Sequence, residues 1–310
     1  MNEAYFHAIE GAGLVRILGE TRQDYLQRQS SNDIGLLSSI SALPNILTAP
    51  TGKILEIFTV IDDGDGYMLA TPAARGSSLS SYFQARIFFN DQVEIHDNSK
   101  DWIQFKLIGS QWIEIFSNLF KIEINAQLNS VSVESIGEWE LRFIVEKNIG
   151  IEPSFLLLAP SEAGPKLKSI FDENGAINMG DSEMEALRIS SATLGPGEIF
   201  GDFTPFEIGL DDRVSSSKGC YPGQEVLARQ ITYDKVTRSL VKLTANGPAA
   251  VGMNVLGEGK IVGKVTSANP KETGSFALAV VKKPFNKPGA KIQLKNQEQT
   301  LLAKILSPAF

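Results

Sequence analysis

The chain has 310 residues, of which 43% are hydrophobic, and its formal net charge at pH 7 is −7. This length exceeds one typical domain and predicts two or three compact units. An acidic surface argues against general binding to nucleic acid, because contact with phosphates needs a positive surface. No run of about 18 apolar residues is present, so we expect no membrane span and no membrane partner. We predict a cytoplasmic protein.

The counts of cysteine and histidine restrict the chemistry further. The sequence has one cysteine, Cys220, and two histidines, His7 and His96. A single cysteine excludes an internal disulfide, which fits a reducing compartment. Three scattered ligands do not make a structural zinc site, and one cysteine does not hold a four-cysteine iron–sulfur cluster. We therefore expect no metal held by this chain alone.

The first third of the chain shows short helical and strand patterns in turn. Residues 19–29 predict a short helix with Thr21 as its N-cap. Residues 53–61 are rich in Ile, Leu, Phe and Val and predict a strand. The acidic run at 62–66 predicts the turn of a β-hairpin rather than a calcium loop, because it lacks the EF-hand spacing. Residues 77–89 carry apolar side chains at helical spacing and predict an amphipathic helix.

Short strands are predicted next, at residues 92–95, 102–107, 112–116, 120–124 and 140–145. These signals are mixed with helices and do not alternate as βαβ units, so they favour an α+β class over a Rossmann sheet.

The second half begins with a helix and ends with strands. Ser182 and Glu185 form the pattern of a capping box and predict a helix that continues through Ile189. Gly195-Pro-Gly197 then marks a loop. Short β-like runs follow, separated by Gly, Pro and Asn, at residues 240–243, 260–267, 276–281, 290–294 and 301–305. They predict a small antiparallel barrel of about 70 residues.

Cys220 lies in the most unusual segment, Lys218-Gly-Cys-Tyr-Pro-Gly-Gln-Glu225. The glycines and the proline of this segment predict a tight turn, and the residues after it predict the start of a helix. Cys220 would then precede a helix N-terminus, with Lys218 close by. A positive local field favours the thiolate form of a cysteine, which can attack a disulfide, take up an oxidative cap or ligate iron. The alternative is a buried cysteine that packs as a small hydrophobic residue, and the residues alone leave both interpretations open.

This segment resembles the signature of the YgfZ family, a folate-binding-like branch of the aminomethyltransferase (glycine cleavage T-protein, GcvT-like) superfamily. Further segments resemble the family in the same order along nearly the whole chain, at residues 19–33, 51–56, 187–189, 204–210, 263–267 and 277–279. The resemblance implies a three-part α+β arrangement around a central cavity. The parts would be residues 1–50 together with 130–235, residues 51–129, and a C-terminal β-barrel at 236–310.

The resemblance also implies a function. The family assists the assembly or repair of iron–sulfur proteins, so assembly or client proteins are the expected partners, together with tetrahydrofolate as a small-molecule ligand. Cys220 is the residue most closely tied to function, and Lys218 and Arg229 would favour its thiolate. The residues expected around the ligand are Lys218, Gly219, Tyr221, Gly223, Gln224, Glu225, Arg229, Arg188 and Glu56.

Two departures from the superfamily pattern bear on these expectations. Where aminomethyltransferases proper carry paired carboxylates, this chain has Glu56 and Ile57, and an isoleucine cannot accept a proton. Where relatives carry a glutamate suited to a pterin, it has Ser190, and a hydroxyl cannot accept two parallel N–H bonds. Both departures weaken the expectation of tetrahydrofolate binding. Two alternatives remain: a tetrahydrofolate-dependent aminomethyltransferase, and a small-molecule-binding module with a structural cysteine.

Overall fold

The computed structural model describes residues 3–72, 74–272 and 274–309. The chain forms two compact units. The first contains the chain up to Leu47 together with Glu56–Asp181 and Ser217–Tyr221. The second contains Thr48–Leu55, Ser182–Ser216 and the chain from Pro222 onward. The three-part division expected from the family resemblance stays a prediction.

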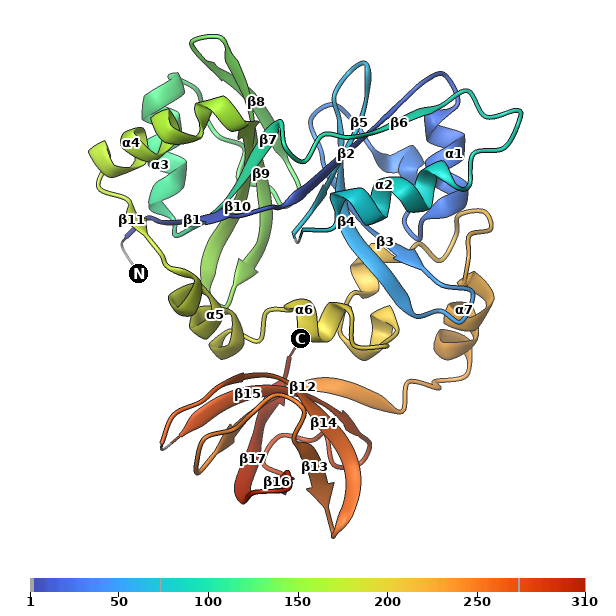
Figure 1. The fold of residues 1–310 in the computed structure, drawn as a ribbon, viewed down its shortest axis with the longest axis vertical. Helices are drawn as coiled ribbons and strands as arrows, with labels where there is room; N and C mark the ends of the chain where they lie inside the picture. The colour runs from blue at the N-terminus through green and yellow to red at the C-terminus, as the bar shows by residue number, and fades with distance from the viewer. Residues whose placement is uncertain (1–2, 73, 273, 310) are drawn as a thin grey trace. The chain divides into compact units, whose positions relative to one another are not determined.

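The first unit holds a six-stranded sheet in the order β11-β1-β7-β10-β9-β8 (Figure 1). Its neighbouring strands are antiparallel except β1 and β11, which are parallel. The strands are β1 (Tyr5–Ile9), β7 (Trp102–Ile108), β8 (Val131–Ile136), β9 (Trp139–Ile149), β10 (Glu152–Pro160) and β11 (Ile177–Asn178).

Two helices, α3 (Gln111–Phe120) and α4 (Gly164–Glu173), pack on this sheet. Their apolar faces join aromatic side chains of the strands in one core, in which Trp112 of α3 lies 4.9 Å from Phe171 of α4 between ring centroids. Aromatic side chains contribute large buried areas, so this cluster supplies much of the apolar stabilisation of the unit.

A second sheet has the order β3-β4-β5-β2-β6. Its strands are β2 (Gly13–Leu18), β3 (Leu43–Thr48), β4 (Ile54–Asp62), β5 (Gly66–Thr71) and β6 (Glu94–Asp97). The helices α1 (Arg22–Gln29) and α2 (Gly76–Gln84) contribute Tyr25 and Phe83 to its core. The predicted hairpin at the acidic turn is confirmed, since Asp62 pairs with Tyr67 across β4 and β5.

Two predicted strands of the first unit are wrong. The predicted strand at 112–116 lies in the first half of helix α3. The predicted strand at 120–124 starts at the last residue of that helix, Phe120, which is followed by Lys121 in the left-handed conformation (φ 59°). The apolar positions Trp112, Ile115 and Phe116 are buried on one side of this helix. A short apolar run fits either a strand or a buried helix, and here the spacing of three and four residues decides for the helix.

Three local predictions also need correction. Thr21 stands at the N-cap of α1, but its hydroxyl accepts a hydrogen bond from the backbone N–H of Gln92 rather than capping the helix. Helix α5 (Asp181–Ser190) begins one residue before Ser182, and the Glu185 carboxylate accepts a hydrogen bond from Arg188 on the same helix. Helix α2 ends at Gln84, well before residue 89, and the side chains at 87–89 are exposed.

The second unit contains a closed antiparallel barrel in the order β12-β15-β14-β13-β16-β17 (Figure 1). The strands are β12 (Arg238–Ala245), β13 (Asn254–Gly257), β14 (Lys260–Asn269), β15 (Ser275–Lys282), β16 (Lys291–Lys295) and β17 (Thr300–Pro308). Alternate residues such as Val241, Leu243 and Ile305 fill its interior. The predicted α+β class and the C-terminal barrel are confirmed, and within the barrel the four-residue β13 was not predicted.

The rest of the second unit is mostly helical and short. It includes α5, α6 (Pro196–Ile199), the 3₁₀ turn η3 (Pro205–Glu207) and α7 (Gln224–Thr232). The predicted loop at Gly195-Pro-Gly197 therefore contains the start of a one-turn helix. Among the described residues, no helix is both long and apolar enough to cross a membrane.

Candidate functional site

Cys220 is exposed to solvent in the segment that leads to helix α7. Gly219 beside it is also exposed, and a Cβ built on this glycine would have no neighbouring atom within 4 Å. The thiol is therefore open to reagents and to partner proteins. This exposure contradicts the alternative interpretation of Cys220 as a buried structural residue.

Lys218 is buried, with only 7% of its surface exposed. Its ammonium donates hydrogen bonds to the carbonyl oxygens of Gln27 (2.6 Å), Ser30 (2.5 Å) and Asn32 (3.0 Å). These carbonyls lie at the end of α1 and in the turn that follows it. Burial lowers the pKa of Lys218 to about 8, and the charge of Asp33 opposes this effect. Lys218 therefore ties its own segment to α1 instead of standing as a solvated surface charge.

Tyr221, on the other side of the cysteine, is buried as well. Its ring centroid lies 5.1 Å from the Lys218 ammonium, within the range of a cation–π contact. Burial raises the pKa of the Tyr221 hydroxyl to about 12. The two buried side chains thus anchor the backbone before and after the exposed pair Gly219 and Cys220.

The turn before α7 has the conformation that its sequence predicts. Gly223 occupies the N-cap position with φ +84°, a conformation that other residues rarely adopt. A Cβ at Gly223 would also lie 2.4 Å from the carbonyl oxygen of Ala49, so the position has no room for a side chain. Helix α7 then starts at Gln224, as predicted.

The charged residues of α7 form a surface ion pair. The Arg229 guanidinium donates to the Glu225 carboxylate at 2.6 Å, and both side chains are exposed. An exposed pair of this kind contributes little to stability. Arg229 is therefore engaged on its own helix, and its expected role beside Cys220 stays a prediction.

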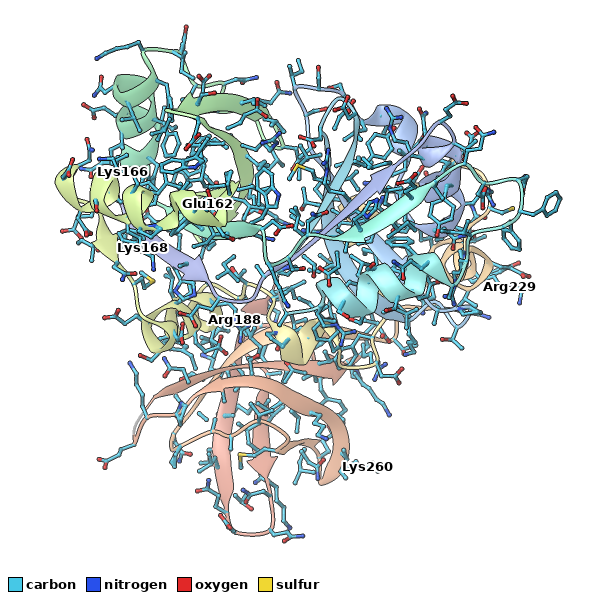
Figure 2. All side chains as sticks on the ribbon, turned by 45° about the horizontal axis from the view of Figure 1, so that its top comes forward. Glu162, Lys166, Lys168, Arg188, Arg229 and Lys260 are labelled. Atoms are coloured by element: carbon cyan, nitrogen blue, oxygen red, sulfur yellow. The ribbon has the colours of Figure 1, made fainter. Side chains whose placement is uncertain are left out.

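Arg188 lies on α5, where Figure 2 labels it. It is buried and surrounded by acceptors of the second unit. Its guanidinium binds the carboxylates of Glu185 and Glu198 and the hydroxyl of Ser267 on β14. The nearby Ser190 hydroxyl donates to the Leu187 carbonyl at 2.9 Å. The structure thus places Arg188, which was expected at the ligand, in contacts within the chain, and it does the same for Ser190, which stands at the place of the expected pterin-binding glutamate.

Glu56, on β4, is also buried and internally bonded. Its carboxylate accepts hydrogen bonds from Arg75 Nε (2.8 Å), Thr71 Oγ1 (3.1 Å) and the backbone N–H of Ile57 (3.2 Å). Burial raises the pKa of Glu56, and the bonds from Arg75 and Thr71 oppose the effect. Ile57 itself is buried, so the place of the second carboxylate is filled by an apolar side chain.

Two buried carboxylates were missed by sequence reasoning. Glu198 accepts from the backbone N–H of Gly195 at 2.8 Å, and Glu207 accepts from that of Thr204 at 2.9 Å. Glu207 also binds the Arg238 guanidinium at 2.6 and 3.1 Å. A helix-start signal was available for Glu207, because Thr204 and Glu207 have the spacing of a capping box.

No group of three or more His, Cys, Asp or Glu side chains within residues 3–72, 74–272 and 274–309 is arranged to hold a metal ion.

Comparison with known proteins adds the family context. Residues 238–310, which contain the barrel, match the family model "Glycine cleavage T-protein C-terminal barrel domain". The chain is 30% identical over 275 residues to a chloroplastic protein of Arabidopsis thaliana that is named, provisionally, as a transferase. That alignment covers 87% of this chain but only 63% of the relative's length.

Other relatives have more specific names. The chain is 25% identical over 324 residues to an aminomethyltransferase of Oceanobacillus iheyensis, with 96% of this chain and 84% of the relative covered. It is 23% identical over 248 residues to the tRNA-modifying protein YgfZ of Colwellia psychrerythraea, with 78% and 72% covered.

A solved structure has the same fold. The glycine cleavage system aminomethyltransferase T from Bartonella henselae superposes with a TM-score of 0.84 at 17% identity, covering 98% of this chain and 85% of that one. At this level of identity, the likeness concerns the fold. The chain therefore has the aminomethyltransferase T fold, and its residues 238–310 match the C-terminal barrel domain of the glycine cleavage T-protein.

Proposed function

We propose that this chain is a YgfZ-type member of the superfamily that assists the assembly or repair of iron–sulfur proteins through the thiol of Cys220. The observation that supports this most directly is the contrast between Cys220 and its neighbours. Cys220 is exposed, whereas Lys218 and Tyr221 on either side are buried. An anchored loop presents the sulfur in a defined place, as a group that must meet a partner protein requires.

One thiol limits the chemistry that this chain can perform alone. A single thiolate supplies one ligand to an iron atom of a cluster that a partner protein holds with its remaining ligands. The thiol proton passes to solvent when the sulfur binds iron, because the thiolate is the ligand. In this proposal the cluster is the cargo and the partner is an assembly or client protein.

Lys218 has a positioning role in this proposal. Its three hydrogen bonds to carbonyl oxygens hold the segment that carries Cys220 against the end of α1. The ammonium offers three donors, which these acceptors use. Loss of Lys218 would therefore loosen the loop without removing the sulfur.

Glu56 and Arg188, two of the residues expected to bind tetrahydrofolate, do not fit such a ligand, because both are bonded within the chain. The Glu56 carboxylate accepts three hydrogen bonds from within the chain, and Arg188 binds two carboxylates of the chain. Ser190 offers a hydroxyl that is already bonded to a backbone carbonyl. A pterin recognised by a carboxylate needs two free acceptor positions side by side. Folate therefore has no part in the proposed role of Cys220.

The test is a strain whose chromosomal copy carries Cys220→Ser, assayed for the activity of several iron–sulfur enzymes. We expect their activities to fall while enzymes without clusters stay unchanged. A strain with Lys260→Met serves as the matched control, because Lys260 is exposed on the barrel. Full iron–sulfur enzyme activity in the Cys220→Ser strain, with the variant protein present at normal abundance, would contradict the proposal.

A second candidate is aminomethyl transfer to tetrahydrofolate, and the names of the aminomethyltransferase relatives favour it. The buried Glu56 carboxylate, whose pKa is raised by burial, is the acid or base that such an activity would use. Turnover of a lipoyl-bound aminomethyl donor to methylene-tetrahydrofolate, lost in Glu56→Gln, would support this candidate. We expect no turnover, because Ile57 occupies the place of the second carboxylate.

A further inference from the structure

We infer that Arg188, where the family resemblance expects a ligand contact, is bonded by the chain's own carboxylates and binds no ligand. Its contacts with Glu185, Glu198 and Ser267, which we call the latch, hold α5, α6 and barrel strand β14 together. This inference concerns the second unit alone and does not depend on the proposed role of Cys220.

Arg188 makes five hydrogen bonds within the chain. Its Nε donates to Glu185 at 2.7 Å, and one Nη2 hydrogen bond goes to the other oxygen of the same carboxylate. Nη2 also donates to Ser267 Oγ at 2.8 Å. Nη1 donates to the Thr193 carbonyl at 2.8 Å and to Glu198 Oε2 at 3.2 Å. A guanidinium has five N–H donors, and these five contacts match that number.

Glu198 is fully buried, with 0% of its side chain exposed. Besides Arg188, its carboxylate accepts from the Gly195 N–H at 2.8 Å and from Ser267 Oγ at 2.7 Å. A carboxylate is buried at great cost unless it is paired and hydrogen-bonded. Glu198 thus depends on Arg188 and Ser267, and it accepts a hydrogen bond from an Arg188 N–H that an anionic ligand group would otherwise use.

The backbone packs closely around Arg188 and Glu198. A Cβ at Gly195 would lie 2.5 Å from the guanidinium carbon of Arg188, so the arginine lies directly against the glycine. A Cβ at Gly197 would lie 2.2 Å from the carbonyl oxygen of Thr266 on β14. Both glycines permit close approaches that other residues would prevent. The space around Arg188 is therefore filled by α6 and β14.

Together these contacts join three elements that are separate in sequence. Arg188 and Glu185 come from α5, Glu198 comes from α6, and Ser267 comes from β14. A ligand that used Arg188 would have to displace at least one buried carboxylate and leave it without its partner. We therefore expect no tetrahydrofolate contact at Arg188, and we assign the residue a structural role in holding the helices on the barrel.

Calorimetric titration with 5-formyltetrahydrofolate, a stable folate, tests the closed site on the full chain. Three proteins are compared: wild type, Arg188→Lys, and the control Lys260→Arg, at an exposed lysine of the barrel. We expect either no binding up to about 1 mM or binding that Arg188→Lys changes by less than about twofold. Binding that weakens about tenfold or more in Arg188→Lys, but not in Lys260→Arg, would overturn the inference.

A double-mutant cycle tests the latch itself. Urea unfolding is measured for wild type, Arg188→Lys, Ser267→Ala and the double variant, all chosen because they remove few atoms. We expect each single variant to unfold at lower urea and the two losses to be clearly less than additive, since both break one network. Additive losses would show that the two residues act independently and would refute the latch. The titration and the double-mutant cycle both leave Cys220 unchanged. A result against the latch is therefore distinguishable from a result against the proposed function.

Discussion

The ammonium of Lys218 lies 2.6 Å from the carbonyl oxygen of Gln27, a residue 191 positions earlier in the chain. This bond joins the cysteine segment to the end of α1, so the place of Cys220 depends on a contact between distant parts of the sequence. The charge of Lys218 serves this attachment, which is a different role from activating a neighbouring thiol at the surface.

Replacing Lys218 by methionine should destabilise the protein by about 2–5 kcal/mol, because three buried carbonyl oxygens lose their donor. Urea unfolding measures the change. Lys260→Met, at an exposed lysine of the barrel, should stay within about 0.5 kcal/mol of wild type. Equal stability of the two variants would show that the carbonyls are readily satisfied without Lys218.

The same residue predicts a dependence on pH. Burial lowers the pKa of Lys218 to about 8 from its ordinary 10.5, so the folded chain releases this proton before the unfolded chain does. Between these two pH values the unfolded state binds more protons, and stability rises with pH. The free energy of unfolding of wild type, measured against Lys218→Met from pH 7 upward, should therefore increase across this window. If the difference in free energy of unfolding between the two proteins does not change with pH, the carbonyl oxygens keep Lys218 protonated.

Gly195→Ala should cost about 1–3 kcal/mol through crowding alone. The backbone of Gly195 has φ −132°, which alanine adopts without strain, but the new Cβ would lie 2.5 Å from the Arg188 guanidinium carbon. Gly219→Ala is the matched control, because a Cβ there meets no atom within 4 Å. Thermal unfolding compares the two, and a loss at Gly219 as large as that at Gly195 would refute the steric argument.

The Cys220 thiol should react in the folded protein with one equivalent of an aromatic disulfide reagent, since it is exposed. We expect a rate within about tenfold of that measured in concentrated urea, because access does not require unfolding. Absorbance of the released thiolate follows the reaction. A thiol that reacts only after urea is added would place Cys220 in a protected position and remove the basis of the proposed function.

Trp112→Ala should destabilise the first unit by about 3–5 kcal/mol, because the indole is buried among the aromatic rings of α4 and the sheet. Phe89→Ser should change stability by less than about 0.5 kcal/mol, because Phe89 is fully exposed. Urea unfolding followed by circular dichroism measures both. Comparable losses for the two variants would contradict the packing of α3.

Some features were predictable because they depend on neighbouring residues. The barrel strands alternate apolar and polar side chains, as Val241 and Leu243 show, and this pattern needs no distant partner. The hairpin at residues 62–66 follows from its glycines. The segment at 112–116 was misassigned because a short apolar run is compatible with both a strand and a helix, and the spacing of its buried residues Trp112, Ile115 and Phe116 is helical.

The features of the candidate site also differ in whether they depend on neighbouring or on distant residues. Short-range pattern and backbone freedom control the α+β class, the C-terminal barrel and the turn between Cys220 and α7, so these features follow from the residues alone. The burial of Lys218 on the carbonyls of α1 and the binding of Arg188 by Glu198 and Ser267 are visible only in the folded chain. Burial and the choice of charge partner depend on residues far away in sequence, which folding alone brings together.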